Sequence, residues 1–230
     1  MSFVIAPPPL VAVPVAGGGS YPVHRVYCVG RNYVDHAVEM GFSGREPPFF
    51  FLKPADTVVP VAAGETGQID YPTLTANLHH EVELVVAIGT GGSGISAADA
   101  PRHIYGYAVG LDMTRRDLQN DMKKQGRPWC VGKAFEQSAP IGTIVPMAQC
   151  GELLTGAISL TVNGSTRQHG DLKDLIWSVN DTIEQLSQGW TLQPGDLIYT
   201  GTPAGVAAVV RGDVMEAQIA GLGALRVAVR

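Results

Sequence analysis

Two apolar runs next to acidic side chains constrain the fold of this 230-residue chain most strongly. The runs span 82–88 and 104–111, and both have the length and composition of buried strands. Glu81 and Glu83 stand two positions apart at the start of the first run, so on a strand their side chains point to the same face. Asp112 directly follows the second run. We therefore expect a β-rich core in which two strand ends carry three carboxylates.

These carboxylates predict a metal site. Buried carboxylates repel one another, and burying them without a cation costs several kcal/mol or forces protonation. Oxygen-only ligation suits Mg²⁺ or Mn²⁺, with some positions left to water or a chelating substrate. The alternative is that Glu81 and Glu83 lie on the solvent face of an edge strand. Asp112, after an equally apolar strand, favours ligation of Mg²⁺ or Mn²⁺ by all three acids.

The rest of the chain has the pattern of an α+β, β-rich protein. The 28 glycines and 16 prolines predict many turns. Because strands and helices do not alternate one for one, we expect a mixed β core with peripheral helices rather than a doubly wound parallel sheet. Thr114 is a good candidate N-cap for one of the helices. Further strands are predicted at 26–29, 158–162, 197–199 and 223–229, and helices at 33–40, 114–124 and 172–186.

We expect a single globular unit overall, because a chain of 230 residues buries enough surface to need no disulfide or structural zinc. Within it, residues 1–60 are expected to form a small N-terminal arm or lobe. Residues 61–230 are expected to form the main β core. Internal repeats at solenoid or propeller spacing are absent from the sequence.

Charge and cysteine content exclude several classes of partner. The net charge is −5 with 16 basic residues, which supplies no electrostatic footprint for nucleic acid. Cys28, Cys130 and Cys150 are odd in number and form no C-x-x-C pair, which indicates reduced thiols. Residues 1–19 carry four prolines and no positive n-region, so we expect neither a signal peptide nor a membrane span. A cytoplasmic enzyme fits these features.

Two stretches imitate other enzyme classes. Residues 89–94 match G-x-G-x-x-G, but the helix before Pro101 is too short for a dinucleotide fold, so a glycine-rich hairpin or surface loop is expected. His80 and Glu81 begin like a zinc-protease helix, yet Leu84 stands where the second histidine is required. Zinc of that type is excluded.

A histidine and a lysine are candidates for catalysis. His36 and Glu39 share one face of the predicted 33–40 helix, and a carboxylate beside an imidazole raises its basicity, as a general base requires. The alternative is a surface histidine with an incidental helical ion pair. Lys133 lies in an apolar run and needs a partner, which the carboxylates or a substrate oxyanion could supply. The turn at 200–203 offers hydroxyls and backbone N–H groups, or is a plain loop.

Taken together, these segments resemble the fumarylacetoacetate hydrolase family, in its small acylpyruvase and fumarylpyruvate hydrolase branch. The resemblance spans about 26–206 in family order. It is carried by Cys-Val-Gly-Arg-Asn-Tyr at 28–33 with His36 and Glu39, Phe-Leu-Lys-Pro at 51–54, Asn-Leu-His-His-Glu-Val-Glu-Leu at 77–84, Leu-Asp-Met-Thr at 111–114 with Arg116 and Asp117, Gly-Lys at 132–133 and Thr-Gly-Thr-Pro at 200–203.

The resemblance implies a mixed β-sandwich roll, usually a homodimer, with Mg²⁺ or Mn²⁺ on Glu81, Glu83 and Asp112. It implies that His36 and Glu39 sit on a lid, within the 1–60 region, and form the water-activating dyad. Lys133 would stabilise developing charge. The positions implied to bind substrate are Arg31, Arg116, Gln119 and Thr202.

The implied activity is hydrolysis of a C–C bond in an acylpyruvate. The run at 47–51 further resembles fumarylpyruvate hydrolases of gentisate breakdown, so fumarate and pyruvate are the expected products. Oxaloacetate decarboxylation and 2-oxo-acid isomerisation are alternatives within the family, since neither needs water as nucleophile. A non-catalytic metal- or ligand-binding protein is an alternative from another class.

Overall fold

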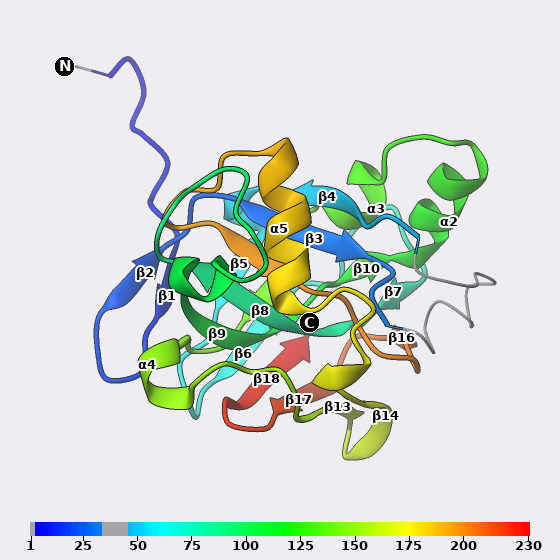
Figure 1. Ribbon diagram of the computed structural model, residues 1–230. Helices are drawn as coiled ribbons and strands as arrows, with labels where there is room; N and C mark the ends of the chain where they lie inside the picture. Colours follow the sequence, from blue (N-terminus) through cyan, green and yellow to red (C-terminus); the bar gives the residue numbers. More distant parts are fainter. Residues whose placement is uncertain (1–2, 34–45) are drawn as a thin grey trace.

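The computed structural model describes residues 3–33 and 46–230, and a large mixed β-sheet is its main element (Figure 1). Among the described residues this sheet has eight strands, and its path runs β4-β3-β15-β8-β9-β11-β5, with β12 also paired to β9. Its strands are β3 (Val26–Gly30), β4 (Phe49–Lys53), β5 (Val58–Pro60), β8 (Val82–Ile88), β9 (Ile104–Leu111), β11 (Ala139–Ile141), β12 (Val145–Pro146) and β15 (Leu197–Tyr199).

A second sheet packs against the large one through contacts of β13 with β8 and of β17 and β18 with β9. Within the described part of the chain it has five strands in the order β14-β13-β17-β18-β6. These strands are β6 (Thr66–Ile69), β13 (Ala157–Val162), β14 (Ser165–Asp171), β17 (Val214–Ile219) and β18 (Gly223–Val229). Small ladders join β1 (Ala12–Pro14) to β2 (Ser20–Pro22) and β7 (Leu78–His79) to β10 (Thr114–Arg115) and β16 (Ala208–Val209).

The helices are few and peripheral (Figure 1). In the described residues they are α2 (Arg116–Lys124), α3 (Cys130–Lys133), α4 (Met147–Cys150) and α5 (Val179–Gly189), with 3₁₀ turns at Ala55–Thr57, Ala100–His103 and Leu172–Asp174. Both main sheets mix parallel with antiparallel pairs, since β3 runs parallel to β15 and β18 runs parallel to β6. The predicted α+β, β-rich sandwich with a mixed core is therefore confirmed.

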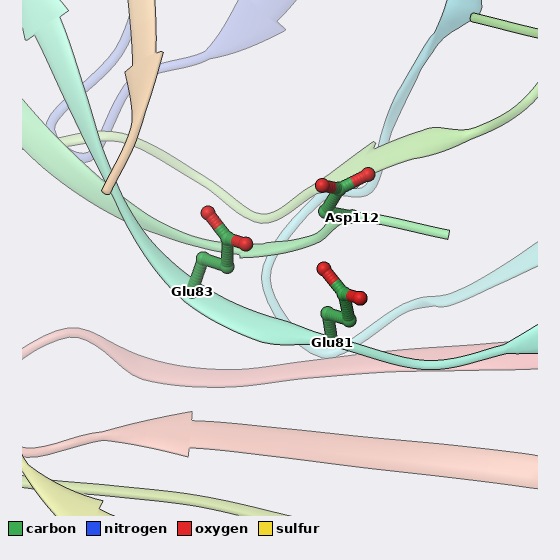
Figure 2. A group of neighbouring side chains, drawn as sticks. All are labelled: Glu81, Glu83 and Asp112. Carbon is green, nitrogen blue, oxygen red and sulfur yellow. The ribbon is translucent and has the colours of Figure 1, made fainter. Parts of the chain in front are cut away.

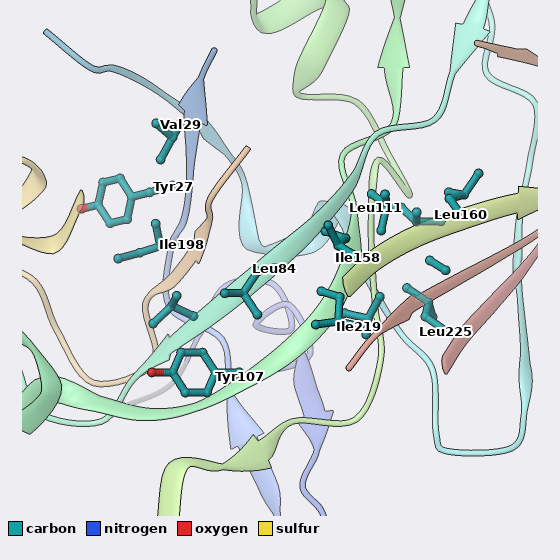
Figure 3. Close-up of a cluster of buried hydrophobic side chains, with 14 of the residues drawn as sticks. Tyr27, Val29, Leu84, Tyr107, Leu111, Ile158, Leu160, Ile198, Ile219 and Leu225 are labelled. Carbon is teal, nitrogen blue, oxygen red and sulfur yellow. The ribbon is translucent and has the colours of Figure 1, made fainter. Parts of the chain in front are cut away.

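The core lies between the two sheets. Leu84 on β8 packs there with Ile158 and Leu160 from β13 and Leu225 from β18, and all of these side chains are buried (Figure 3). The opposite face of β8 is also buried, because Val85 lies in a second apolar cluster with residues of β3 and β15. A strand covered on both faces explains the unbroken apolar run, and it places the acids near residue 83 in a dry environment.

The predicted helix at 172–186 is wrong in its start. Helix α5 begins at Val179, because Ser178 caps it: the Ser178 hydroxyl accepts from the Asp181 N–H, and the Asp181 carboxylate accepts from the Ser178 N–H. Leu175 instead forms an isolated antiparallel β-bridge with Tyr33. The helix-like spacing of apolar residues therefore ran across two different structural elements. The predicted strands at 26–29, 82–88, 104–111, 158–162, 197–199 and 223–229 agree with β3, β8, β9, β13, β15 and β18 within one residue.

Thr114 is not the N-cap that its sequence position suggested. It lies in β10, and α2 begins at Arg116 without a side-chain cap. The Thr114 hydroxyl donates to the carbonyl of Asp112 and accepts from Lys133.

The residues 89–94 form a loop, not the start of a crossover helix, as expected. No helix in the described part of the chain is long and apolar enough to cross a membrane.

Candidate metal and active site

Glu81, Glu83 and Asp112 converge at one end of the β8–β9 pair (Figure 2). The antiparallel register pairs Val82 with Leu111, and the N–H of Asp112 donates to the carbonyl of Glu81 across 2.9 Å. One oxygen from each acid lies within 4.8 Å of the others. The three residues are only 5%, 2% and 1% exposed, so their charges are not screened by water.

The donor set fits a hard divalent cation. Carboxylate oxygens are the ligands that Mg²⁺ and Mn²⁺ prefer. Asp112 Oδ1 is buried and accepts no hydrogen bond from the described residues, although Lys53 Nζ forms an ion pair with it at 2.9 Å. Burial, together with the charges of Asp112 and Glu81, raises the pKa of Glu83 well above its ordinary range. The group of acids can therefore hold a metal ion, which would keep all three carboxylates ionised.

Lys133 connects the acids from α3. Its Nζ donates to Glu81 Oε2 at 2.8 Å, to Asp112 Oδ2 at 2.6 Å and to Thr114 Oγ1 at 2.7 Å. Burial lowers the pKa of Lys133, but Asp112 and Glu81 outweigh burial, so the net pKa is raised. The ammonium thus stays charged inside the protein, as the apolar run around it required.

Lys53 is a second buried cation that the sequence analysis did not assign to the site. It ends β4, is 1% exposed, and donates to the backbone carbonyls of Met113 and Lys133. Together with its ion pair to Asp112, these bonds connect the end of β4 to the end of β9 and to the end of α3. The signal was available, because a lysine that directly follows a run of apolar strand residues needs a buried partner.

One cavity contains the triad and every described residue that the sequence analysis assigned to catalysis or substrate binding. Arg31, Arg116, Gln119, Lys133 and Thr202 all line it. Arg116 bridges Glu81 and Gln119 through its guanidinium. Arg31 has φ of 57°, a left-handed backbone that is uncommon outside glycine, and its guanidinium lies 5.3 Å from the centre of the Phe49 ring. The cavity therefore combines three carboxylates with cationic and amide side chains.

The turn at 200–203 closes the cavity from β15. The N–H of Gly201 donates to Glu83 Oε2 at 2.8 Å, and Thr200 donates its hydroxyl to the carbonyl of Leu84. Gly201 has φ of 102°, and a Cβ there would lie 2.7 Å from the Cβ of Asn32. Only glycine therefore fits at this position. The turn was predicted to be either part of the site or a plain loop, and its bond to Glu83 connects it directly to the triad.

His36 and Glu39 lie outside the described residues. The two histidines next to the triad are held neutral: burial and the charge of Arg116 lower the pKa of His79 to about 4, and burial lowers the pKa of His80. The cavity has a further neighbour that sequence reasoning missed. Gln168 on β14 is fully buried and bonds to Thr202, but a lone glutamine in a strand has no sequence signature of its own.

Comparison with known proteins identifies a family and several named relatives. A family model described as fumarylacetoacetate (FAA) hydrolase C-terminal matches residues 25–230. A fumarylpyruvate hydrolase of Ralstonia sp. is 47% identical over 184 residues, which cover 80% of this chain and 93% of that protein. A mitochondrial oxaloacetate tautomerase of Rattus norvegicus is 41% identical over 201 residues, which cover 87% of this chain and 89% of that protein.

A solved structure is closer still. The crystal structure of fumarylpyruvate hydrolase from Pseudomonas aeruginosa in complex with Mn²⁺ and pyruvate superposes with a TM-score of 0.97. The two sequences are 56% identical, and the match covers 99% of each chain. The relatives thus include both a fumarylpyruvate hydrolase and an oxaloacetate tautomerase.

Proposed function

Because the chain belongs to the fumarylacetoacetate hydrolase family, we propose that it is a metal-dependent hydrolase of acylpyruvates, with fumarylpyruvate as its substrate. One observation carries the proposal: the buried triad of Glu81, Glu83 and Asp112 shares a cavity with Lys133 and Arg116. The similarity to the Pseudomonas aeruginosa enzyme over 99% of the chain supports the same substrate. The products would be fumarate and pyruvate.

The triad would hold Mg²⁺ or Mn²⁺, which supplies Lewis acidity to the 2-oxo acid end of the substrate. We propose that Arg116, Gln119 and Thr202 bind the anionic oxygens at that end, because their donor groups line the same cavity. Arg31, which lines the cavity and packs on the Phe49 ring, would meet the acyl half. These residues orient the scissile bond and exclude water from the triad.

The water nucleophile needs a base. We propose His36, oriented by Glu39, in that role, and the lowered pKa values of His79 and His80 make those two histidines poor bases at neutral pH. His36 takes a proton from water, the hydroxyl oxygen bonds to the distal carbonyl carbon, and the C–C bond breaks. Its electron pair leaves with pyruvate as the enolate, which then takes up a proton at carbon.

Lys133 would stabilise the oxyanion that forms at the distal carbonyl. Its ammonium already donates to Glu81, Asp112 and Thr114, so one of these bonds must be exchanged for the substrate. The bond to the neutral hydroxyl of Thr114 is the weakest of the three in electrostatic terms, and we propose that it is the one exchanged.

The proposal is tested by incubating the Mg²⁺- or Mn²⁺-loaded protein with fumarylpyruvate and following the loss of enol absorbance. Production of fumarate and pyruvate in equal amounts is expected, and a rate equal to that of buffer would remove the hydrolase assignment. The matched control is Asp112→Asn protein in the same assay. This variant keeps the side-chain volume but removes a carboxylate from the triad.

Oxaloacetate tautomerisation or decarboxylation is the second candidate, favoured by the 41% identity to the Rattus norvegicus tautomerase. Both reactions use the same metal and enolate chemistry without a water nucleophile. A substrate panel of acylpyruvates and oxaloacetate separates the candidates through the ratio of their kcat/KM values.

We also propose that the enzyme is a cytoplasmic homodimer, for which light scattering would report twice the 24.3 kDa mass of the chain.

A further inference from the structure

Gln168 is a buried polar residue in an otherwise exposed part of β14. It is 0% exposed, whereas Arg167 and His169 on either side face solvent. The register explains this: Leu160 pairs with Gln168 and Thr161 with Thr166, so Arg167 is an extra residue in the strand. Such a bulge turns the next side chain away from its regular direction. Here it points the Gln168 amide into the space between β8 and the 200–203 turn.

The amide of Gln168 has one possible orientation. The N–H of Val82 can only donate and lies 3.1 Å from Oε1, while the carbonyl of Pro203 can only accept and lies 2.9 Å from Nε2. Oε1 also faces His80 Nδ1 at 2.8 Å, so that ring nitrogen must carry the proton. The side chain thus links the backbone between two triad acids to the turn that lines the cavity.

The same amide determines what Thr202 can do. Gln168 Nε2 lies 2.7 Å from Thr202 Oγ1, and because an amide nitrogen only donates, the hydroxyl is the acceptor of this bond. Among the described residues none accepts the proton of the Thr202 hydroxyl. Thr202 is 3% exposed and lines the cavity that holds Glu81, Glu83 and Asp112. Its proton is left to be donated into that cavity.

We propose that Gln168 is a positioning residue, whose amide N–H occupies one of the two acceptor lone pairs of the Thr202 hydroxyl and thereby directs the hydroxyl proton to an anionic oxygen of the bound 2-oxo acid. This inference rests on the proposed function, because it takes a 2-oxo acid as the occupant of the cavity. The competing explanation is that Gln168 only stabilises the packing of β14 against β8. The two explanations differ in whether the effect of Gln168 passes through Thr202.

A double-mutant cycle with pyruvate as the probe tests the inference. The variants are Gln168→Met, which keeps the length of the side chain, Thr202→Val, which keeps its shape without the hydroxyl, and the double variant. Thr202→Ser retains a hydroxyl, and Gln218→Met, at an exposed glutamine bonded to Glu216, is the surface control. Calorimetry measures the Kd of each variant for Mn²⁺ and then, in the Mn²⁺-loaded protein, the Kd for pyruvate.

Loss of the hydroxyl bond to an anion is expected to weaken pyruvate binding about tenfold or more in Thr202→Val, and loss of the directing amide to weaken it about threefold to tenfold in Gln168→Met. The double variant should bind pyruvate as Thr202→Val does. Thr202→Ser should regain most of the affinity that Thr202→Val loses, and the surface control Gln218→Met should bind as the wild type does. The Kd for Mn²⁺ should change by less than about threefold, since neither residue is a ligand candidate.

Three results overturn the inference: pyruvate affinity of Thr202→Val equal to that of wild type, full additivity of the two effects, or no pyruvate binding by the wild type. If Gln168→Met fails to fold, the pyruvate affinity of Thr202→Val still tests the inference. Hydrolysis of fumarylpyruvate is measured in parallel on the wild type, so loss of the proposed activity is seen separately from loss of the Gln168–Thr202 coupling.

Discussion

Lys133 Nζ lies 2.6 Å from Asp112 Oδ2, and both side chains are almost completely buried. The ammonium also bonds to Glu81, so it joins the two strand ends that carry the triad. A buried charge is stable only while its partners are present, because the attraction between the ions offsets the free-energy cost of removing each ion from water. The site is therefore a set of mutually dependent charges.

Replacing Lys133 by methionine should destabilise the metal-free protein by about 3–5 kcal/mol, since it removes the buried cation that Glu81 and Asp112 share and leaves them with Arg116 and Lys53. A bound Mn²⁺ supplies positive charge to the same carboxylates, so most of the lost stability should return on metal addition. Chemical denaturation with EDTA and with Mn²⁺ measures both quantities. The matched control is Arg102→Met, whose exposed pair with Asp99 contributes less than about 1 kcal/mol. Equal losses in the two variants would refute the argument.

Gly201→Ala should lower both stability and metal affinity. The added methyl would meet Asn32 at 2.7 Å and displace the N–H that donates to Glu83. Gly212 is the control, because its φ of 93° carries a similar conformational strain while nothing lies within 4 Å of the added Cβ. We expect Gly212→Ala to cost about 1–2 kcal/mol with unchanged Mn²⁺ affinity, and Gly201→Ala to cost more and to weaken Mn²⁺ binding. Thermal denaturation and calorimetry separate the two effects.

The sequence predicted the strands of the site because burial on both faces leaves an unbroken apolar run, as in β8 and β9. It failed where side-chain partners decide the structure. The hydroxyl of Thr114 is used by Lys133 rather than by a helix, and the reciprocal bonds of Ser178 and Asp181 start α5 inside the predicted helix. Such contacts join residues far apart or compete with a neighbouring pattern, so composition and periodicity do not reveal them.

Some site residues could be predicted from local sequence and others could not. The triad follows from strand geometry and charge repulsion, which are local. The role of Gln168 depends on a strand bulge and on Thr202, which is 34 positions away in the chain. No local sequence pattern predicts the bulge or the contact with Thr202.

His36→Ala should reduce the kcat for fumarylpyruvate hydrolysis by about 10²–10⁴, the range expected for loss of a general base. Affinity for Mn²⁺ should stay at the wild-type value, because the triad is intact. Oxaloacetate decarboxylation, which needs no activated water, should fall less. His103→Ala, at a partly exposed histidine bonded to the carbonyl of Thr90, is the control and should be fully active. Unchanged hydrolysis in His36→Ala would exclude the proposed dyad.

Binding of Mn²⁺ should release protons and should weaken as the pH falls. Burial, Asp112 and Glu81 raise the pKa of Glu83 in the metal-free fold, so its carboxyl keeps a proton at pH values where the unfolded chain has lost it. In that window the folded state binds more protons, and this group therefore makes the metal-free protein less stable as the pH rises from the ordinary glutamate pKa toward the raised one. Ligation requires the carboxylate, so the metal must displace the proton.

Calorimetric titration with Mn²⁺ in buffers of different ionisation enthalpy measures this release. The apparent enthalpy should vary linearly with the buffer enthalpy, and its slope should give the number of protons released per metal ion. Glu83→Gln has no proton to lose at this position, so it should bind Mn²⁺ more weakly and show a smaller slope. Identical enthalpies in all buffers for the wild type would mean that Glu83 is already ionised before the metal arrives. Lys133 and the N–H of Gly201 would then have to offset both burial and the repulsion from Asp112 and Glu81.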